Sequence, residues 1–135
     1  VADVKRQGND LTVVTNGTML MKTLAVVERL AQEGMDVEVI DPRTLVPLDR
    51  DTIIDSVCKT GRLLVIHEAC QTGGWAGEII ASVTSSRAFG YLDTPARRLT
   101  GKDCPIPYNR GLERAAVPQE EDIESEIRAI LTGVY

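Results

Sequence analysis

The stretch Arg62–Glu78, RLLVIHEACQTGGWAGE, decides the fold of this chain. The continuous apolar run over residues 63–66 indicates a strand that is covered on both faces. The Gly73–Gly74 pair then allows the backbone to turn without a Cβ penalty. Apolar side chains at four-residue spacing follow, as on the buried stripe of a helix: Trp75, Ile79 and Val83. We therefore predict a buried strand, a glycine loop and a helix.

The flanking sequence repeats this alternation of strands and helices. Three further strands are predicted, at Leu11–Thr15, Met35–Ile40 and Ala96–Thr100, and Val117 is a candidate for a short edge strand. Residues 1–9 are expected to form a linker or an edge segment, and residues 10–135 one domain. The order of elements predicts an α/β fold, a three-layer α/β/α domain with a mostly parallel sheet and possible space for one antiparallel edge strand.

Capping residues indicate where the helices begin and end. Thr18 and Asp49 are suited to helix N-caps, because their side-chain oxygens accept bonds from free backbone N–H groups. Gly34 and Gly61 are expected to stop the first two helices in the left-handed conformation. Pro118 is well placed at the start of the final helix.

Composition narrows the class of protein. The chain has 135 residues, 43% hydrophobic and 26% charged, with a net charge of −5. The acidic balance argues against a general nucleic-acid binder, and no apolar run approaches the roughly 20 residues of a membrane span. The three cysteines, Cys58, Cys70 and Cys104, are odd in number and lack metal-type spacing, which favours a reduced, intracellular compartment.

No complete catalytic, cofactor-binding or metal-binding set is recognisable. His67-Glu68 begins like a zinc-protease motif, but the second histidine that this motif requires is Gln71. Gly101-Lys102 resembles part of a phosphate-binding loop, yet the flanking positions do not match. The glycines after residue 72 do not form a dinucleotide fingerprint.

Single residues at the end of the central strand have two interpretations each. His67 is a general acid or base, alone or paired with a Cys70 nucleophile, or it is an interface histidine beside a small apolar Cys70. Glu68 is a functional carboxylate or a cap for the next helix, and Trp75 is expected to pack in the core or an interface. From the residues alone, an assembly domain and a free-standing small-molecule-binding domain both stay open.

Five blocks, in this order and spacing, resemble one family: VVTNGTM, VEVIDPRTLVPLD, KTGRLLVIHEA, GGWAGEI and RRLTGKDCPIPYN. They are similar to the C-terminal domain of the β subunit of the E1 component of 2-oxo acid dehydrogenase complexes. This is the third domain of transketolase-like thiamine diphosphate enzymes. The resemblance covers about Asp10 to Tyr135 and implies a five-stranded mixed sheet with one antiparallel strand. Another transketolase-like enzyme is the alternative within this class.

The resemblance also implies an activity that other domains complete. The intact enzyme would decarboxylate pyruvate or a branched-chain 2-oxo acid oxidatively, or cleave acetoin, and pass the acyl group to a lipoyl group on E2. Thiamine diphosphate and Mg²⁺ would lie on the E1 α subunit and the N-terminal domain of β, so we expect no catalytic, cofactor-binding or metal site on this chain. The expected location is the bacterial cytoplasm, or the mitochondrial matrix in a eukaryote.

The partners implied by the resemblance are the E1 α subunit, a second E1 β subunit and the peripheral subunit-binding domain of E2. Asp93, in LDTP, matches the family's acidic position for E2 docking, and the C-terminal carboxylate would be that of Tyr135. Glu68 matches a strand-end glutamate that we interpret as an interdomain contact. His67 and Trp75 complete the set of interface candidates. No nucleic acid or membrane partner is expected.

Overall fold

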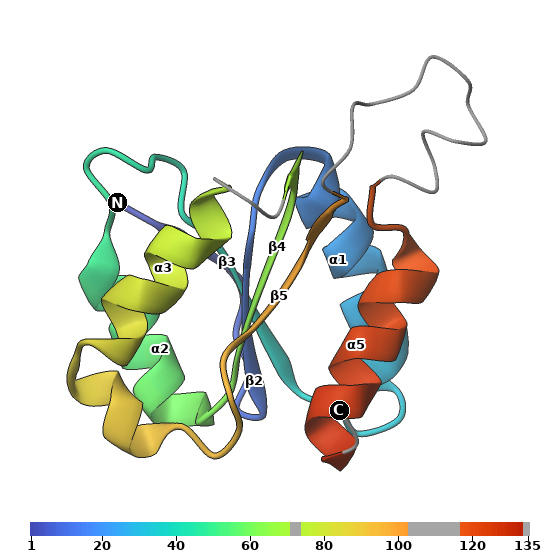
Figure 1. Cartoon of the computed structure of the whole chain (residues 1–135). Helices are drawn as coiled ribbons and strands as arrows, with labels where there is room; N and C mark the ends of the chain where they lie inside the picture. The colour runs from blue at the N-terminus through green and yellow to red at the C-terminus, as the bar shows by residue number, and fades with distance from the viewer. Residues whose placement is uncertain (71–73, 103–116, 134–135) are drawn as a thin grey trace.

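The computed structural model describes residues 1–70, 74–102 and 117–133, and it shows a single five-stranded sheet between helices (Figure 1). The strand order is β1-β3-β2-β4-β5. The strands are β1 (Asp3–Arg6), β2 (Leu11–Thr15), β3 (Val37–Asp41), β4 (Leu63–Cys70) and β5 (Arg97–Gly101). All neighbouring pairs are parallel except β1 with β3, so the sheet is mixed with one antiparallel edge.

Helices cover both faces of the sheet (Figure 1). One face carries α1 (Gly17–Ala31) and α5 (Glu120–Thr132), and the other carries α2 (Arg50–Thr60) and α3 (Trp75–Thr84). A short 3₁₀ helix, η1 (Arg87–Tyr91), follows α3 and leads to β5. The three-layer α/β/α architecture predicted from the order of elements is therefore confirmed.

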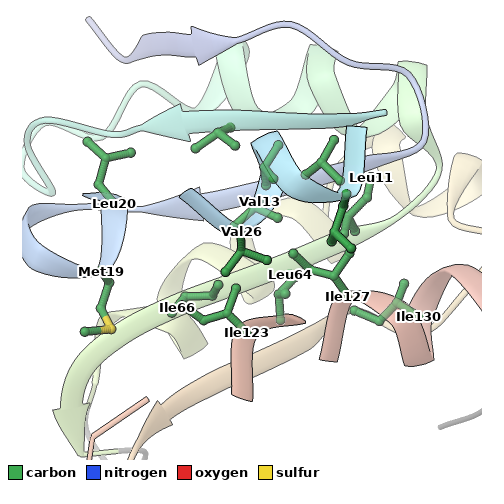
Figure 2. Close-up of a cluster of buried hydrophobic side chains, with 14 residues drawn as sticks. Leu11, Val13, Met19, Leu20, Val26, Leu64, Ile66, Ile123, Ile127 and Ile130 are labelled. Carbon is green, nitrogen blue, oxygen red and sulfur yellow. The ribbon is translucent and has the colours of Figure 1, made fainter. Parts of the chain in front are cut away.

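The core is divided by the sheet into two clusters, because alternate residues of a strand point to opposite faces. On the side of α1 and α5, Leu64 and Ile66 of β4 meet Ile123 and Ile127 of α5 (Figure 2). On the side of α2 and α3, the intervening β4 residues pack against those helices. The main members of this second cluster are Leu63, Val65, Ile53, Val57, Ile79 and Val83.

The helix ends follow the expected capping chemistry with two exceptions, at Thr18 and at Pro118, which lies before the Gln119 N-cap of α5 (Glu120–Thr132). Asp49 accepts a bond from the Thr52 N–H at 3.2 Å, and Gly61 ends α2 with φ +75°. Gly34 has φ +86°, and two bonds of a Schellman motif, Gly34 N–H to Ala31 O and Met35 N–H to Leu30 O, end α1 around it. The expected Thr18 cap is wrong, because α1 already begins at Gly17, after Asn16.

Residues Asp3–Arg6 take the edge alternative expected for residues 1–9 and join the sheet as an edge strand, with Asp3 opposite Asp41 of β3. Several strand boundaries differ from the prediction. β3 and β5 begin and end one or two residues later than expected. β4 continues past the apolar run to Cys70, which pairs with Gly101, so His67 and Glu68 lie three and two residues before the end of the strand rather than at it. Val117 lies in a bend before α5, so the additional edge strand predicted there is wrong. Among the described helices, none is long and apolar enough to cross a bilayer.

Candidate functional site

His67 and Trp75 meet at the carboxyl end of β4. His67 is 1% exposed, and its ring centroid lies 5.0 Å from that of Trp75 with the planes tilted by 44°. Strand alternation places His67 on the same face as Leu63 and Val65, beneath the first turn of α3. The structure therefore brings two of the sequence-predicted interface residues into direct contact.

Glu68, the next residue, is exposed. Because adjacent strand residues point to opposite faces, its carboxylate is directed away from the face that holds His67 and Trp75. His67 and Glu68 are thus neighbours in sequence that belong to different sides of the sheet. The Cys70 side chain, with which one interpretation pairs His67, lies outside the described residues. Gly73 of the glycine loop also lies outside them.

A groove of about 480 Å³ opens beside Trp75, between α3 and the loop that precedes α2. Its lining is largely apolar: Leu45, Val46, Pro47, Leu48, Trp75 and Ile79. The side chain of Val46 is 92% exposed, and that of Leu45 is 41% exposed. Exposed apolar side chains gathered beside a half-buried tryptophan are typical of a surface that another protein covers.

Asp93 lies at the other end of the sheet, near the start of β4 and β5. Its N–H donates a hydrogen bond to the carbonyl oxygen of Gly61 at 2.7 Å, and its side chain is exposed. The described end of α5 reaches the same end of the domain (Figure 1). Tyr135, the remaining interface candidate, lies outside the described residues. Four of the five candidates are therefore placed, and they divide between two opposite ends of the domain.

A buried polar cluster was missed by the sequence reasoning. The Glu38 carboxylate, in a side chain 4% exposed, accepts hydrogen bonds from Lys59 Nζ at 2.5 Å, Ser56 Oγ at 2.6 Å and the Gly8 N–H at 3.1 Å. The Thr12 hydroxyl extends the cluster, 2.7 Å from Ser56 Oγ. Burial pushes the pKa of Glu38 upward, but the bonds from Lys59, Ser56 and Gly8 outweigh it and hold the pKa below its usual value.

This cluster is structural rather than catalytic in its geometry. It joins β3, α2 and the turn after β1, and each carboxylate oxygen already has a donor. A second tie holds the N-terminal segment to α2, because the Ala2 N–H donates to Asp49 Oδ2 at 2.9 Å. The hydroxyl and N–H of Thr52 and the N–H of Ala2 together lower the pKa of Asp49.

An ionic seam joins α5 to α1 on the far face. Arg128 binds Glu33 at 2.7 Å and Glu124 at 3.1 Å, and Arg29 binds Glu124 at 3.2 Å and Glu120 at 2.9 Å. The hydrogen bonds from Arg128 and Arg29 lower the pKa of Glu124. These side chains are substantially exposed, so their interactions are screened by solvent. The seam aligns α5 with α1 above the apolar contact.

Neither end of the domain offers a set of metal ligands. Over residues 1–70, 74–102 and 117–133, no three side chains of His, Cys, Asp or Glu gather closely enough to hold an ion. What the described residues do present is one buried imidazole under an indole, an apolar groove beside it, and an exposed carboxylate at the far end.

The family model of the transketolase C-terminal domain matches residues 1–123. The chain belongs to this family. Among relatives, the pyruvate dehydrogenase E1 component subunit beta-1, mitochondrial, of Arabidopsis thaliana is 47% identical over 134 residues, which are 99% of this chain and 36% of that protein. The subunit beta of Cyanidium caldarium is 42% identical over 130 residues, 96% of this chain and 39% of the relative. The subunit beta of Rickettsia bellii is 41% identical over 129 residues, which are 96% of this chain and 39% of that protein.

Solved structures support the same architecture. A chain described as "Split gene transketolase, inactive beta4 tetramer" superimposes with a TM-score of 0.77 at 22% identity, over 98% of this transketolase C-terminal domain and 42% of that chain. At this identity the likeness shows the fold. The domain spans between 36% and 39% of the length of the E1 subunit beta relatives named above.

Proposed function

We propose that this chain is the C-terminal domain of a pyruvate dehydrogenase E1 β-like subunit, and that it serves assembly and docking rather than chemistry. The observation that carries this proposal is identity of 41–47% to E1 component β subunits across nearly the whole chain. The intact enzyme would decarboxylate pyruvate oxidatively and transfer the acetyl group to a lipoyl group. Its partners would be an E1 α subunit, a second β subunit and E2.

Thiamine diphosphate and Mg²⁺ are assigned by this proposal to other parts of the enzyme. Among the described residues, no three metal-ligating side chains come together. His67, the one histidine of the chain, is packed under Trp75.

The groove beside Trp75 supports the assembly role. Leaving Val46 almost wholly in water forgoes burial worth about 1.5–3 kcal/mol for a side chain of this kind. A subunit or domain that covered the groove would recover that free energy for each exposed apolar residue. We assign this end of the domain to contacts within the E1 heterotetramer.

Asp93 supports the docking role at the opposite end. An exposed carboxylate attracts the basic residues of a partner over a distance set by the ionic strength. Such a charge raises the rate of association more than it raises the affinity. Separation of the two ends would let E2 dock at one while the other stays covered by E1 subunits.

Co-expression of a full-length β subunit carrying this domain with its α subunit tests the assembly role. Val46→Asp places a charge in the groove, and we expect sedimentation to show separated subunits where the unmodified protein forms a heterotetramer. Met21→Asp, at an apolar residue that is 68% exposed on α1, is the matched control. Unchanged assembly of Val46→Asp would remove the groove from the interface. A ligand retained by the isolated chain in native mass spectrometry would favour the small-molecule-binding alternative.

A further inference from the structure

Residues 2–8, called here the N-terminal strap, are bonded to α2 near both ends of that helix. At one end, the Ala2 N–H donates a hydrogen bond to Asp49, the N-cap of α2, at 2.9 Å. At the other end, the Gly8 N–H donates to Glu38 at 3.1 Å, and the same carboxylate accepts bonds from the C-terminal half of α2. The strap is therefore attached to α2 at two points, in addition to its pairing with β3.

The strap also contributes to the apolar layer beneath the groove. Ala2 is 9% exposed and belongs to the core cluster on the side of α2 and α3, and Val4 and Leu48 pack against that cluster. Leu48 also lines the groove beside Trp75. Figure 1 shows the N-terminus beside the loop that leads from β3 to α2. The beginning of the strap and one wall of the groove thus share a single apolar cluster.

Asp49 connects the strap to residues 42–48, called here the groove loop because four of them line the groove. The hydrogen bonds described within this loop join residues at most three positions apart, such as that from Thr44 Oγ1 to the Pro47 carbonyl oxygen at 2.8 Å. The bond from Ala2 to Asp49, by contrast, joins residues 47 positions apart. It is the described hydrogen bond that attaches this end of the loop to a distant segment.

The groove loop holds a backbone conformation that depends on its surroundings. Arg43 has φ +65°, a left-handed conformation that a residue with a side chain keeps only when its neighbours hold it there. The charge of Arg43 also acts on the strap, because the pKa of Asp3 is lowered by a hydrogen bond from Lys5 and by the charge of Arg43. The strap and the strained loop therefore interact through charge as well as through the Asp49 carboxylate.

We propose that the N-terminal strap is a clamp, through which the part of the subunit that precedes this domain holds the groove beside Trp75 in shape. The proposal rests on the proposed function in one respect, since that function places another domain of the β subunit before residue 1. A chain that enters at Ala2 fixes Asp49, and Asp49 fixes the groove loop. A loop that is ordered before its partner arrives loses less conformational entropy on binding, so the clamp favours assembly. Asp49 is a positioning residue, because it acts on the groove through the loop.

Two substitutions release the strap in different ways. Asp49→Ser keeps an N-cap for α2, because serine and aspartate cap helices about equally well, but its one short side-chain oxygen is used by the cap. Ala2→Pro removes the N–H donor and leaves Asp49 unchanged. Thr52→Val is the matched control, since it removes the hydroxyl bond to the same Asp49 oxygen, at 2.6 Å, and leaves the bond from Ala2 in place.

The test is hydrogen exchange, measured by mass spectrometry on the full-length β subunit, free and with its α subunit. Loss of a bond to a charged acceptor should speed exchange about ten- to hundredfold in both release variants. We expect this in the strap and also at Arg43 and Thr44, the loop amides that have acceptors. The interior strands β2 and β4 should exchange as before, and Thr52→Val should leave the strap and the loop unchanged. Both release variants should also assemble about tenfold more weakly.

Faster exchange in the strap and the groove loop together, in both release variants, supports the clamp. Faster exchange in the strap alone overturns it, because the loop would then be held independently, and unchanged exchange in Ala2→Pro overturns it as well. If Asp49→Ser exchanges faster throughout the domain, that variant has lost its fold and Ala2→Pro decides. Faster exchange throughout the domain in both variants overturns the clamp, because the strap would then support the whole fold rather than the groove.

The assembly measurement separates the clamp from the proposed function. Full-strength assembly of both release variants, where Val46→Asp prevents assembly, overturns the part of the clamp in assembly and leaves the groove in the interface. Failure of the unmodified β subunit to join an α subunit overturns the proposed function. Exchange in the free β subunit still decides in that case whether the strap holds the groove loop.

Discussion

Replacing Glu38 by alanine tests the buried cluster that ties the edge of the sheet to α2. The change leaves the buried Gly8 N–H without its acceptor, which costs about 1–3 kcal/mol, and it removes a charge-assisted bond from Ser56 worth about 1.5–3 kcal/mol. Lys59 is 39% exposed and can turn to water, so its bond adds about 1 kcal/mol or less. We expect the free energy of unfolding to fall by about 4 kcal/mol at neutral pH.

The loss should depend on pH in a defined direction. The pKa of Glu38 is lowered in the folded protein. A carboxyl group of this kind stabilises the fold above its unfolded pKa of about 4.3, and the contribution disappears as the pH falls through the folded value. The difference in stability between the unmodified protein and Glu38→Ala should therefore be constant above about pH 6 and shrink on acidification.

Urea unfolding at several pH values provides the measurement. Trp75 is the only tryptophan of the chain, so its fluorescence reports the α3 side, and far-ultraviolet circular dichroism reports the whole. Lys59→Met is the matched control and should cost about 1 kcal/mol, since Ser56 and Gly8 still bind the carboxylate. A loss below about 1 kcal/mol for Glu38→Ala with an unchanged denaturant slope, or a loss independent of pH, would refute this account of the cluster.

Four further substitutions probe the packing that positions the two ends. Gly8→Ala would place a Cβ 2.5 Å from the backbone nitrogen of Glu38, and we expect destabilisation of about 3 kcal/mol in urea unfolding, with a value near zero showing that the turn can move aside. Ile127→Ala empties part of the α5 contact, and thermal unfolding should show a loss of about 2–5 kcal/mol, whereas a loss under about 1 kcal/mol would mean that α5 is held mainly by its ionic seam. Gly61→Ala and Gly34→Ala both force a left-handed alanine, costing about 1–2 kcal/mol. Only the former would also meet Asp93, so Gly61→Ala should be the more destabilising of the two, and equal losses would contradict the close contact.

Much of the fold could be predicted because its determinants are local. The apolar run 63–66, the alternation around β3 and the glycines at positions 34 and 61 each act within a few residues. The extension of β4 through His67 could not be predicted in the same way. Its cause is distant in sequence, since the strand is prolonged by pairing of Cys70 with Gly101 and His67 is covered by Trp75.

Charged residues limit what the sequence shows about the edge of the sheet and about its interior. β1 is short and carries Asp3, Lys5 and Arg6, a composition that suits an edge strand but resembles a linker. Glu38 lies between apolar neighbours, so alternation alone does not show that it is buried. Helices were predicted on both faces of the sheet, and this would have indicated that Glu38 is buried. A buried charge requires a partner, and Lys59 on α2 is that partner.

The candidate site was predicted in part. His67 and Trp75 were expected near one strand end, and the structure adds that they touch. A hollow beside Asp93 was not foreseen, because it is formed by Phe89, Ile80 and Pro95 from three elements whose arrangement depends on the whole domain. The roles of these surfaces in assembly and docking stay predictions.

The sheet divides the core into two clusters, so substitutions on its two faces affect different sets of contacts. The groove beside Trp75 and the hollow beside Asp93 both lie on the side of α2 and α3, whereas Ile123, Ile127 and Ile130 belong to the core cluster on the side of α1 and α5. Substitutions that share no neighbours have nearly additive effects on stability. Substitutions in the α2–α3 layer and in the α1–α5 layer are therefore expected to change the free energy of unfolding independently of one another.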